Sequence, residues 1–296
     1  MPPAKKPYSK PALSPPALLA HLQQRGLLLP NPLDALHALE YIGYYRLLIY
    51  MRPLQKLDPA TGTQRFTPGT TFGDVLDLYN FDRKLRLLCL DAIERIEVAL
   101  RAAIVSEVAV AHGPHFFLDP RYFDRVSTLV EFYQAASREN KHLAIKHYSQ
   151  RYSTPELPPV WAIMEAITYG SLSRLFSGLK LAHRKSIATR FGYDETLLVS
   201  WFRSVNLVRN MCAHHTRLWN SRMLVDQPLS VKSLAAEFTD RERFYARAIV
   251  MGALVEVIDP GSDWRKRLIA LIDAYPKVPT AAMGFPANWR TRNFWR

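Results

Sequence analysis

Apolar residues recur at steps of three and four positions over most of the chain, which is the spacing of amphipathic helices. The longest such stretch begins at Thr71, where Asp74 can complete a helix cap, and from Asp74 to His112 it contains no glycine or proline. Its apolar positions are Leu78, Phe81, Leu85, Leu88, Ala92, Ile96, Ala99 and Ala103. The pattern predicts one long helix from Thr71 to His112. Its charged face is expected to be solvated for the most part and carries Arg83, Lys84, Arg86, Glu94, Arg95, Glu97 and Arg101.

Helical spacing predicts further helices, each bounded by proline, glycine or a capping residue. They cover 18–24, a segment from the Asn31 or Asp34 cap to Met51, 127–147, 161–179, a segment that follows the Asp194 cap, 231–238, 241–257 and 264–275. Residues 1–16 are expected to be extended and 58–69 to form a loop. Strand signals are weak, so the predicted fold class is all-α. We expect an N-terminal helical extension over 1–70 and one compact helical domain over 71–296.

The composition is that of a folded protein with a basic surface. Of the 296 residues, 48% are hydrophobic and 22% are charged, which excludes a disordered chain. The net charge of +13 indicates a class of partner, because a basic protein attracts polyanions and nucleic acid is the commonest of these. A basic surface that binds nothing is the alternative.

Several classes of protein are disfavoured by what the sequence lacks. The two cysteines, Cys89 and Cys212, lie in helical patterns among apolar neighbours and are predicted to be buried and reduced, as in a cytoplasmic protein. No apolar run approaches the ~20 residues of a membrane helix, and the first residues lack the apolar core of a signal peptide. Metal-binding spacings, Gly-rich phosphate loops and serine hydrolase signatures are missing, so we expect no metal and no cofactor.

One segment carries candidate chemistry: Arg209-Asn210-Met211-Cys212-Ala213-His214. An arginine can hold a phosphate by two parallel hydrogen bonds, and a histidine can move a proton near neutral pH. Polar residues at helical spacing form a stripe through it: Arg203, Asn206, Asn210, His214 and Arg217. The expected apolar face of the same helix is Leu197, Trp201, Val205, Val208 and Cys212. Asn and His are unusual in a solvated stripe, where Lys, Glu and Gln are expected, and this favours a chemical role.

The chemistry that these side chains suit is attack by a ribose 2′-OH on the adjacent phosphate of RNA. His214 would be the general base or acid, and Arg209 would stabilise the charge of the transition state. Asn210 would orient His214 or bind a phosphate oxygen. Arg209 and His214 are five residues apart, about 140° around an ideal helix, so they cannot converge on one phosphate from a straight helix. Convergence requires a distorted helix, a ligand across the helix end, or a second copy of the segment related by a twofold axis.

The alternative for the same segment is an arginine and a histidine that only serve hydrogen bonds inside a helix bundle. Candidate RNA contacts near the segment are Arg203, Asn206, His215, Arg217 and Arg222. Two aromatic and basic clusters could stack bases, although packing at the edge of the core explains them equally well: Tyr44, Tyr45 and Arg46, and the tail with Arg290 and Arg292. For the tail, docking of its Trp residues into the core is favoured. Glu165 is expected to pair with an arginine in the core or to line the site.

Six sets of residues, in this order along the chain, resemble the Abi-like (AbiD/AbiF) family of bacterial abortive-infection proteins, part of the HEPN superfamily. They are Ile42-Gly43-Tyr44-Tyr45-Arg46, Tyr79-Asn80-Phe81-Asp82-Arg83-Lys84-Leu85-Arg86, Ile96-Glu97-Val98-Ala99-Leu100-Arg101, Trp161-Ala162-Ile163-Met164-Glu165 with Tyr169-Gly170-Ser171-Leu172-Ser173, Arg209-Asn210-Met211-Cys212-Ala213-His214 with Leu218-Trp219-Asn220, and Met283-Gly284-Phe285-Pro286. Each set is a weak match singly, and together they are specific.

The resemblance implies an all-α HEPN-type helical bundle and a role in phage defence in the bacterial cytoplasm. It implies a metal-independent endoribonuclease whose motif maps to Arg209, Asn210 and His214, and which forms a homodimer through this helix. It also implies an RNA partner, a small structured RNA that restrains the protein as an antitoxin restrains a toxin. Two other functions stay open: an RNA-binding module that does not cleave, and a helical scaffold that senses phage through a protein partner.

Overall fold

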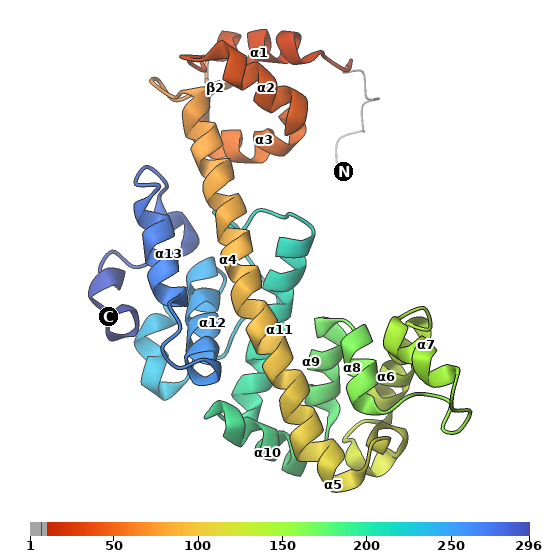
Figure 1. The fold of residues 1–296 in the computed structure, drawn as a ribbon. Coiled ribbons are helices and arrows are strands. Elements are labelled where there is room, and N and C mark those ends of the chain that lie inside the picture. The colour runs from red at the N-terminus through yellow and green to blue at the C-terminus, as the bar shows by residue number, and fades with distance from the viewer. Residues whose placement is uncertain (1–6, 8–10) are drawn as a thin grey trace, which may run out of the picture. The chain divides into compact units, whose positions relative to one another are not determined.

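The computed structural model describes residue 7 and residues 11–296, which divide into two compact units, Met1–Asp82 and Arg83–Arg296 (Figure 1). Most of the segment that was expected to be extended, 1–16, lies outside the described residues. Apart from one two-stranded hairpin and two isolated β-bridges, the regular secondary structure of the described residues is helical, which confirms the all-α prediction. The predicted division into 1–70 and 71–296 stays a prediction. Within the described part of the chain, no helix combines the length and the hydropathy that crossing a membrane requires.

The first unit consists of short helices and one β-hairpin. Its helices are α1 (Pro15–Gln24), α2 (Pro32–Tyr41), α3 (Tyr44–Met51) and the beginning of α4 (Phe72–Ile104). Strands β1 (Gln55–Leu57) and β2 (Gln64–Phe66) pair antiparallel, with Gln55 opposite Phe66. The predicted loop over 58–69 is therefore wrong in part, since it contains β2.

The single helix predicted up to Met51 is broken at Gly43. This residue has φ +88°, a left-handed conformation that a helix cannot contain and that glycine adopts without strain. The core of this unit includes a buried polar pair, in which the hydroxyl of Tyr50 donates a hydrogen bond of 2.7 Å to Asp82.

The second unit is a helical bundle that holds the rest of α4 and all later elements. Its helices are α5 (Val110–His112), α6 (Val126–Arg138), α7 (Leu143–Ser149), α8 (Val160–Ala166), α9 (Tyr169–Gly178), α10 (Leu181–Phe191), α11 (Glu195–Ala213), α12 (Phe244–Ile258) and α13 (Trp264–Asp273). Short 3-10 turns lie at Phe116–Leu118, Pro120–Tyr122, Lys232–Glu237, Thr280–Met283, Trp289–Thr291 and Asn293–Trp295. α11 packs against α9, α10 and α12.

The long helix is confirmed from Phe72 to Ile104, after which a π-helical turn, Val105–Ala109, leads into α5 and the chain leaves the helix at Gly113. Two other predicted helices are each divided in two. The segment 127–147 becomes α6 and α7, because His142 accepts a hydrogen bond from the amide of Ala144 and starts a new helix. The segment 161–179 becomes α8 and α9, because the hydroxyl of Thr168 caps α9 at the amide of Ser171.

Helix α10 has no counterpart among the predicted helices, and the predicted helix 231–238 is a 3-10 turn. Cys89 and Cys212 are both buried and form no disulfide, as predicted. The side chains of the C-terminal tail pack into the core, where Phe285, Trp289 and Trp295 form edge-to-face and tilted ring contacts with ring centroids 5.0–6.0 Å apart. This confirms the predicted docking of the tail tryptophans.

Candidate functional site

Helix α11 carries the motif, and its start and its buried face fix its position. The carboxylate of Asp194 caps it by accepting a hydrogen bond of 2.8 Å from the amide of Thr196. The predicted apolar face is confirmed at Trp201, Val205, Val208 and Cys212, all buried. Leu197 is the exception, because it is half-buried and Leu198 takes the core position.

The helix ends at the motif itself, in a Schellman arrangement. The amide of Thr216 donates to the carbonyl of Met211 at 2.7 Å, and the amide of His215 donates to the carbonyl of Cys212 at 3.1 Å. His215 has φ +56°, the left-handed conformation that glycine usually occupies at this position. His214 is therefore the C-cap that follows the last helical residue, Ala213, and Arg217 lies beyond the helix rather than on its polar stripe.

The motif side chains are at least partly exposed to solvent. Arg209 is half-buried, whereas Asn210 and His214 are exposed. Within residues 11–296, none of the three makes a side-chain hydrogen bond or an ion pair. The alternative of an arginine and a histidine that serve hydrogen bonds within the bundle does not describe this structure. α11 has no break between residues 209 and 213, so helix distortion does not bring Arg209 and His214 together.

Arg209 lines a pocket between α4 and α11, which we call the α4–α11 pocket. Its volume is about 430 Å³ and it is open to solvent. Its lining residues on α4 recur at helical spacing and are Leu90, Ile93, Glu94, Glu97, Val98 and Arg101. The pocket thus combines apolar walls with two carboxylates and two guanidinium groups.

An ion-pair network centred on Arg101 forms one end of the pocket. The guanidinium of Arg101 lies 2.5 Å from the carboxylate of Glu97 and 3.4 Å from that of Glu165, and it donates to the carbonyl of Ile167 at 3.4 Å. The side chains of Glu97 and Arg101 are only 19% and 18% exposed, and Arg86 is buried, so the solvated face predicted for α4 is wrong at these three positions. Glu165 does pair with an arginine, as predicted, but its own side chain is mostly exposed.

Two buried polar atoms near this network, the phenol oxygen of Tyr169 and the amide oxygen of Asn206, have no hydrogen-bond partner among the described residues. Tyr169 is completely buried, and this burial, together with the negative charge of Glu97, raises the pKa of its phenol well above the ordinary value. Asn206 lies against Gly170, where an added Cβ would come within 3.2 Å of the amide oxygen of Asn206. A glycine at this position therefore lets α9 and α11 approach each other closely.

The other candidate RNA contacts near the motif differ in how they are held. Arg203 and His215 are exposed. The guanidinium of Arg217 donates to the carbonyl of Asn220 at 3.2 Å and lies 5.8 Å from the ring of Trp219. Arg222 is paired with Glu242, with 2.8 Å between Nε and the carboxylate.

The basic residues of the tail are also paired. Arg290 lies 2.5 Å from Asp273 and 4.5 Å from the ring of Trp289. Arg292 donates to the carboxylate of Glu237 at 3.2 Å and to the carbonyl of Ala236. Tyr44, Tyr45 and Arg46 lie on α3 of the first unit, where the side chain of Tyr45 is 84% exposed.

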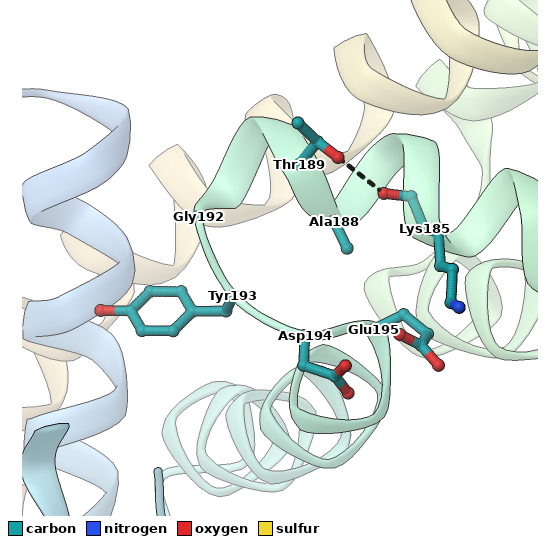
Figure 2. Close-up of a pocket in the computed structure, with 7 residues that line it drawn as sticks. All are labelled: Lys185, Ala188, Thr189, Gly192, Tyr193, Asp194 and Glu195. Carbon is teal, nitrogen blue, oxygen red and sulfur yellow. Dashed lines mark hydrogen bonds between the residues drawn. The ribbon is translucent and has the colours of Figure 1, made fainter. Parts of the chain in front are cut away.

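A second cavity, of about 470 Å³, lies at the turn between α10 and α11 (Figure 2). Its lining residues are Lys185, Ala188, Thr189, Gly192, Tyr193, Asp194 and Glu195. The polar groups here serve local structure, because Asp194 caps α11 and the hydroxyl of Thr189 donates to the carbonyl of Lys185 at 3.0 Å. It lies at the opposite end of α11 from the motif and adds nothing to it.

The fold and the site define an all-α protein in which the end of one helix presents an exposed histidine and an arginine that has no partner in the described part of the chain. The chain belongs to the family of Abi-like proteins, whose family model matches residues 37–220, more than half of the chain. The matched region contains the motif and the whole α4–α11 pocket. No curated protein and no solved structure matches the chain significantly. Membership of this family connects the protein with abortive infection, a form of defence.

Proposed function

We propose that this protein is a metal-independent endoribonuclease of the HEPN type, which acts as the toxin of an abortive-infection system. The observation that carries the proposal is the state of the motif. A half-buried guanidinium that has no hydrogen-bond partner costs free energy unless a ligand accepts its hydrogen bonds. Arg209 is such a group, and it lies near the end of the helix that presents Asn210 and His214.

The reaction needs only these side chains. His214 accepts the proton of a ribose 2′-OH, whose oxygen attacks the adjacent phosphorus and displaces the 5′-oxygen of the next nucleotide. A histidine then returns a proton to the leaving oxygen. Arg209 binds the phosphate oxygens and stabilises the added negative charge in the transition state. Asn210 orients the phosphate or the imidazole. The product ends in a 2′,3′-cyclic phosphate.

We further propose that a small structured RNA restrains the toxin. The net charge of +13 supports an RNA partner, since so basic a chain attracts polyanions. RNA that binds over the exposed end of α11 would compete with substrate for Arg209 and His214.

The decisive experiment compares His214→Ala and Arg209→Ala with the wild-type protein in toxicity on expression and in cleavage of RNA in EDTA. Each variant is expected to lose at least roughly a hundredfold in cleavage rate, because one removes the proton carrier and the other removes charge stabilisation. Matched controls are His147→Ala and Arg138→Ala, which change an exposed histidine and an exposed arginine elsewhere in the second unit. Both controls should keep wild-type activity.

The nucleic acid that copurifies with the protein tests the restraint. A single discrete small RNA is expected, and it should remain bound to His214→Ala, because a proton carrier contributes little to RNA affinity. RNA that is bound equally by wild type and His214→Ala, with full toxicity in both, would instead indicate an RNA-binding module that does not cleave. A protein with neither RNA nor cleavage would indicate a scaffold that acts through a protein partner.

A further inference from the structure

The charged groups of the α4–α11 pocket fall into two sets. Glu97 and Arg101 neutralise each other across 2.5 Å, so they contribute no net charge to a ligand. Glu94 and Arg209 are left, and no ion pair joins them or occupies either of them among the described residues. The pocket therefore offers one carboxylate acceptor and one guanidinium donor on the same lining.

The walls between these two groups are apolar. Leu90, Ile93 and Val98 line the pocket on the face of α4 that also carries Glu94. Packing a flat aromatic ring against such a wall is favourable, because it removes apolar surface from water. The pocket volume of about 430 Å³ is in the range of small-ligand sites. The complementary ligand is a planar group with hydrogen-bond donors on one edge and an anion attached to it.

A phosphate in place of that ring is disfavoured. The lining of the pocket carries as many carboxylates as guanidinium groups, and Glu165 adds a further carboxylate beside Arg101. A phosphate deep in the pocket would face the carboxylate of Glu94, whose negative charge repels it. Arg209 can hold a phosphate only where the ligand leaves the pocket toward the end of α11.

We propose that this pocket binds the nucleobase next to the scissile phosphate, that the preferred base is guanine, and that Glu94 receives the donors of its Watson–Crick edge. Guanine presents an imino and an amino donor side by side, which match the two oxygens of a carboxylate. Adenine and cytosine present one amino group, and uracil presents one imino group between two carbonyls. The inference rests on the proposed nuclease function and adds base preference to it.

Binding is tested first, with His214→Ala so that the RNA stays intact. The probes are short oligouridylates that carry a single guanosine, inosine, adenosine or cytidine, or no other base. The guanosine probe should bind roughly tenfold more tightly than the plain oligouridylate, the effect of one good bidentate contact. Inosine lacks the amino group and should fall between them.

In the double variant His214→Ala/Glu94→Ala, all probes should bind alike. The matched control adds Asp77→Ala, which changes another exposed carboxylate on α4 and should leave the guanosine preference unchanged. Equal binding of all probes to His214→Ala overturns the inference. A guanosine preference that survives Glu94→Ala overturns it as well.

Cleavage separates this inference from the function on which it rests. Wild-type protein should cut a mixed-sequence RNA mainly beside guanosine, and Glu94→Ala should cut the same RNA without this preference. If guanosine is preferred in binding and the preference depends on Glu94, but the wild type cleaves no RNA, the nuclease proposal is wrong and the guanine subsite is supported. If cleavage depends on His214 but shows no base preference, the nuclease proposal is supported and the guanine subsite is wrong.

Discussion

Single arginines in this protein have opposite roles, which depend on what surrounds the guanidinium group. Arg209 has no partner among the described residues, Arg101 is paired with two glutamates, and Arg247 is completely buried without a carboxylate in contact. Instead, Arg247 donates to the carbonyls of Met223 at 3.0 Å and Arg243 at 3.1 Å, and also to that of Arg241. Burial lowers the pKa of Arg247 to about 10, so it remains protonated at neutral pH.

The first prediction concerns Arg247, which ties α12 to the loop that follows the motif. Arg247→Ala leaves several buried carbonyls without donors and should lower the free energy of unfolding by about 3–5 kcal/mol. Urea denaturation followed by circular dichroism measures this loss. The exposed Arg138→Ala should change stability by less than about 0.5 kcal/mol, and an equal effect of the two changes would contradict the role given to Arg247.

At the scale of elements, helix ends and one irregular turn decide where side chains point. α11 stops at the motif because His215 adopts a left-handed conformation. The π-helical turn that follows α4 places Glu107 against α10, where it accepts hydrogen bonds from Ser186 and Arg190. The first feature places His214 at the end of its helix, and the second shifts Glu107 from the position that a regular α-helix would give it.

The second prediction tests the left-handed residue at the end of α11. His215→Val and His215→Asn both remove the imidazole, but only Asn tolerates a positive φ. His215→Val should therefore be less stable than His215→Asn by about 1 kcal/mol in thermal or urea unfolding. Equal stability of the two variants would mean that the helix end is not constrained at this residue.

The third prediction concerns Glu107 in the π-helical turn and the stability that the protein loses in acid. The hydrogen bond from Ser186, and then the hydrogen bond and charge of Arg190, hold the pKa of Glu107 below its ordinary value of 4.5. The unfolded chain therefore binds this proton more readily than the folded protein does. The stabilisation is present above pH 4.5 and is lost as the pH falls through and below that value.

Glu107→Gln should remove that part of the acid sensitivity. Urea midpoints of wild type and Glu107→Gln, measured at neutral pH and at roughly pH 3–4, give the comparison. The wild type should lose more stability than the variant over this range, and parallel losses would show that Glu107 titrates as it does in the unfolded chain.

At the scale of the whole molecule, the nuclease proposal has a geometric requirement. Arg209 and His214 are five residues apart on a regular helix, so one chain presents them in directions about 140° apart. A second chain related by a twofold axis would supply the missing histidine or arginine to each phosphate.

The fourth prediction is that the RNA-free protein is a dimer with a composite site. Light scattering should give twice the 34.0 kDa mass of the chain, and specific activity should fall when the protein is diluted below its dimerisation constant. Mixing inactive Arg209→Ala with inactive His214→Ala should restore part of the activity, because a mixed dimer keeps an arginine and a histidine from different chains. A monomer that cleaves with full activity would contradict this arrangement.

The sequence predicted the features that arise from contacts between near neighbours in the chain. Helical periodicity placed α4, α11 and the all-α class correctly, and local caps such as Asp194 marked helix starts. Where two helices follow each other directly, as at Gly43 and Thr168, the apolar periodicity continues through the break. The sequence pattern therefore predicted one helix where the structure has two. The family was also evident from short local segments.

Only the tertiary structure decided which charges are neutralised and which are left for a ligand. Arg101 on α4 and Glu165 on α8 are 64 positions apart in the sequence, and the network that joins them with Glu97 exists only because the fold brings α8 next to α4. The same packing leaves Glu94 and Arg209 on one pocket lining, without partners among residues 11–296. Charge pairing depends on distances of a few ångströms in space, which the spacing of residues along a helix does not encode. The motif was therefore determined by the sequence by itself, and its surroundings by the fold.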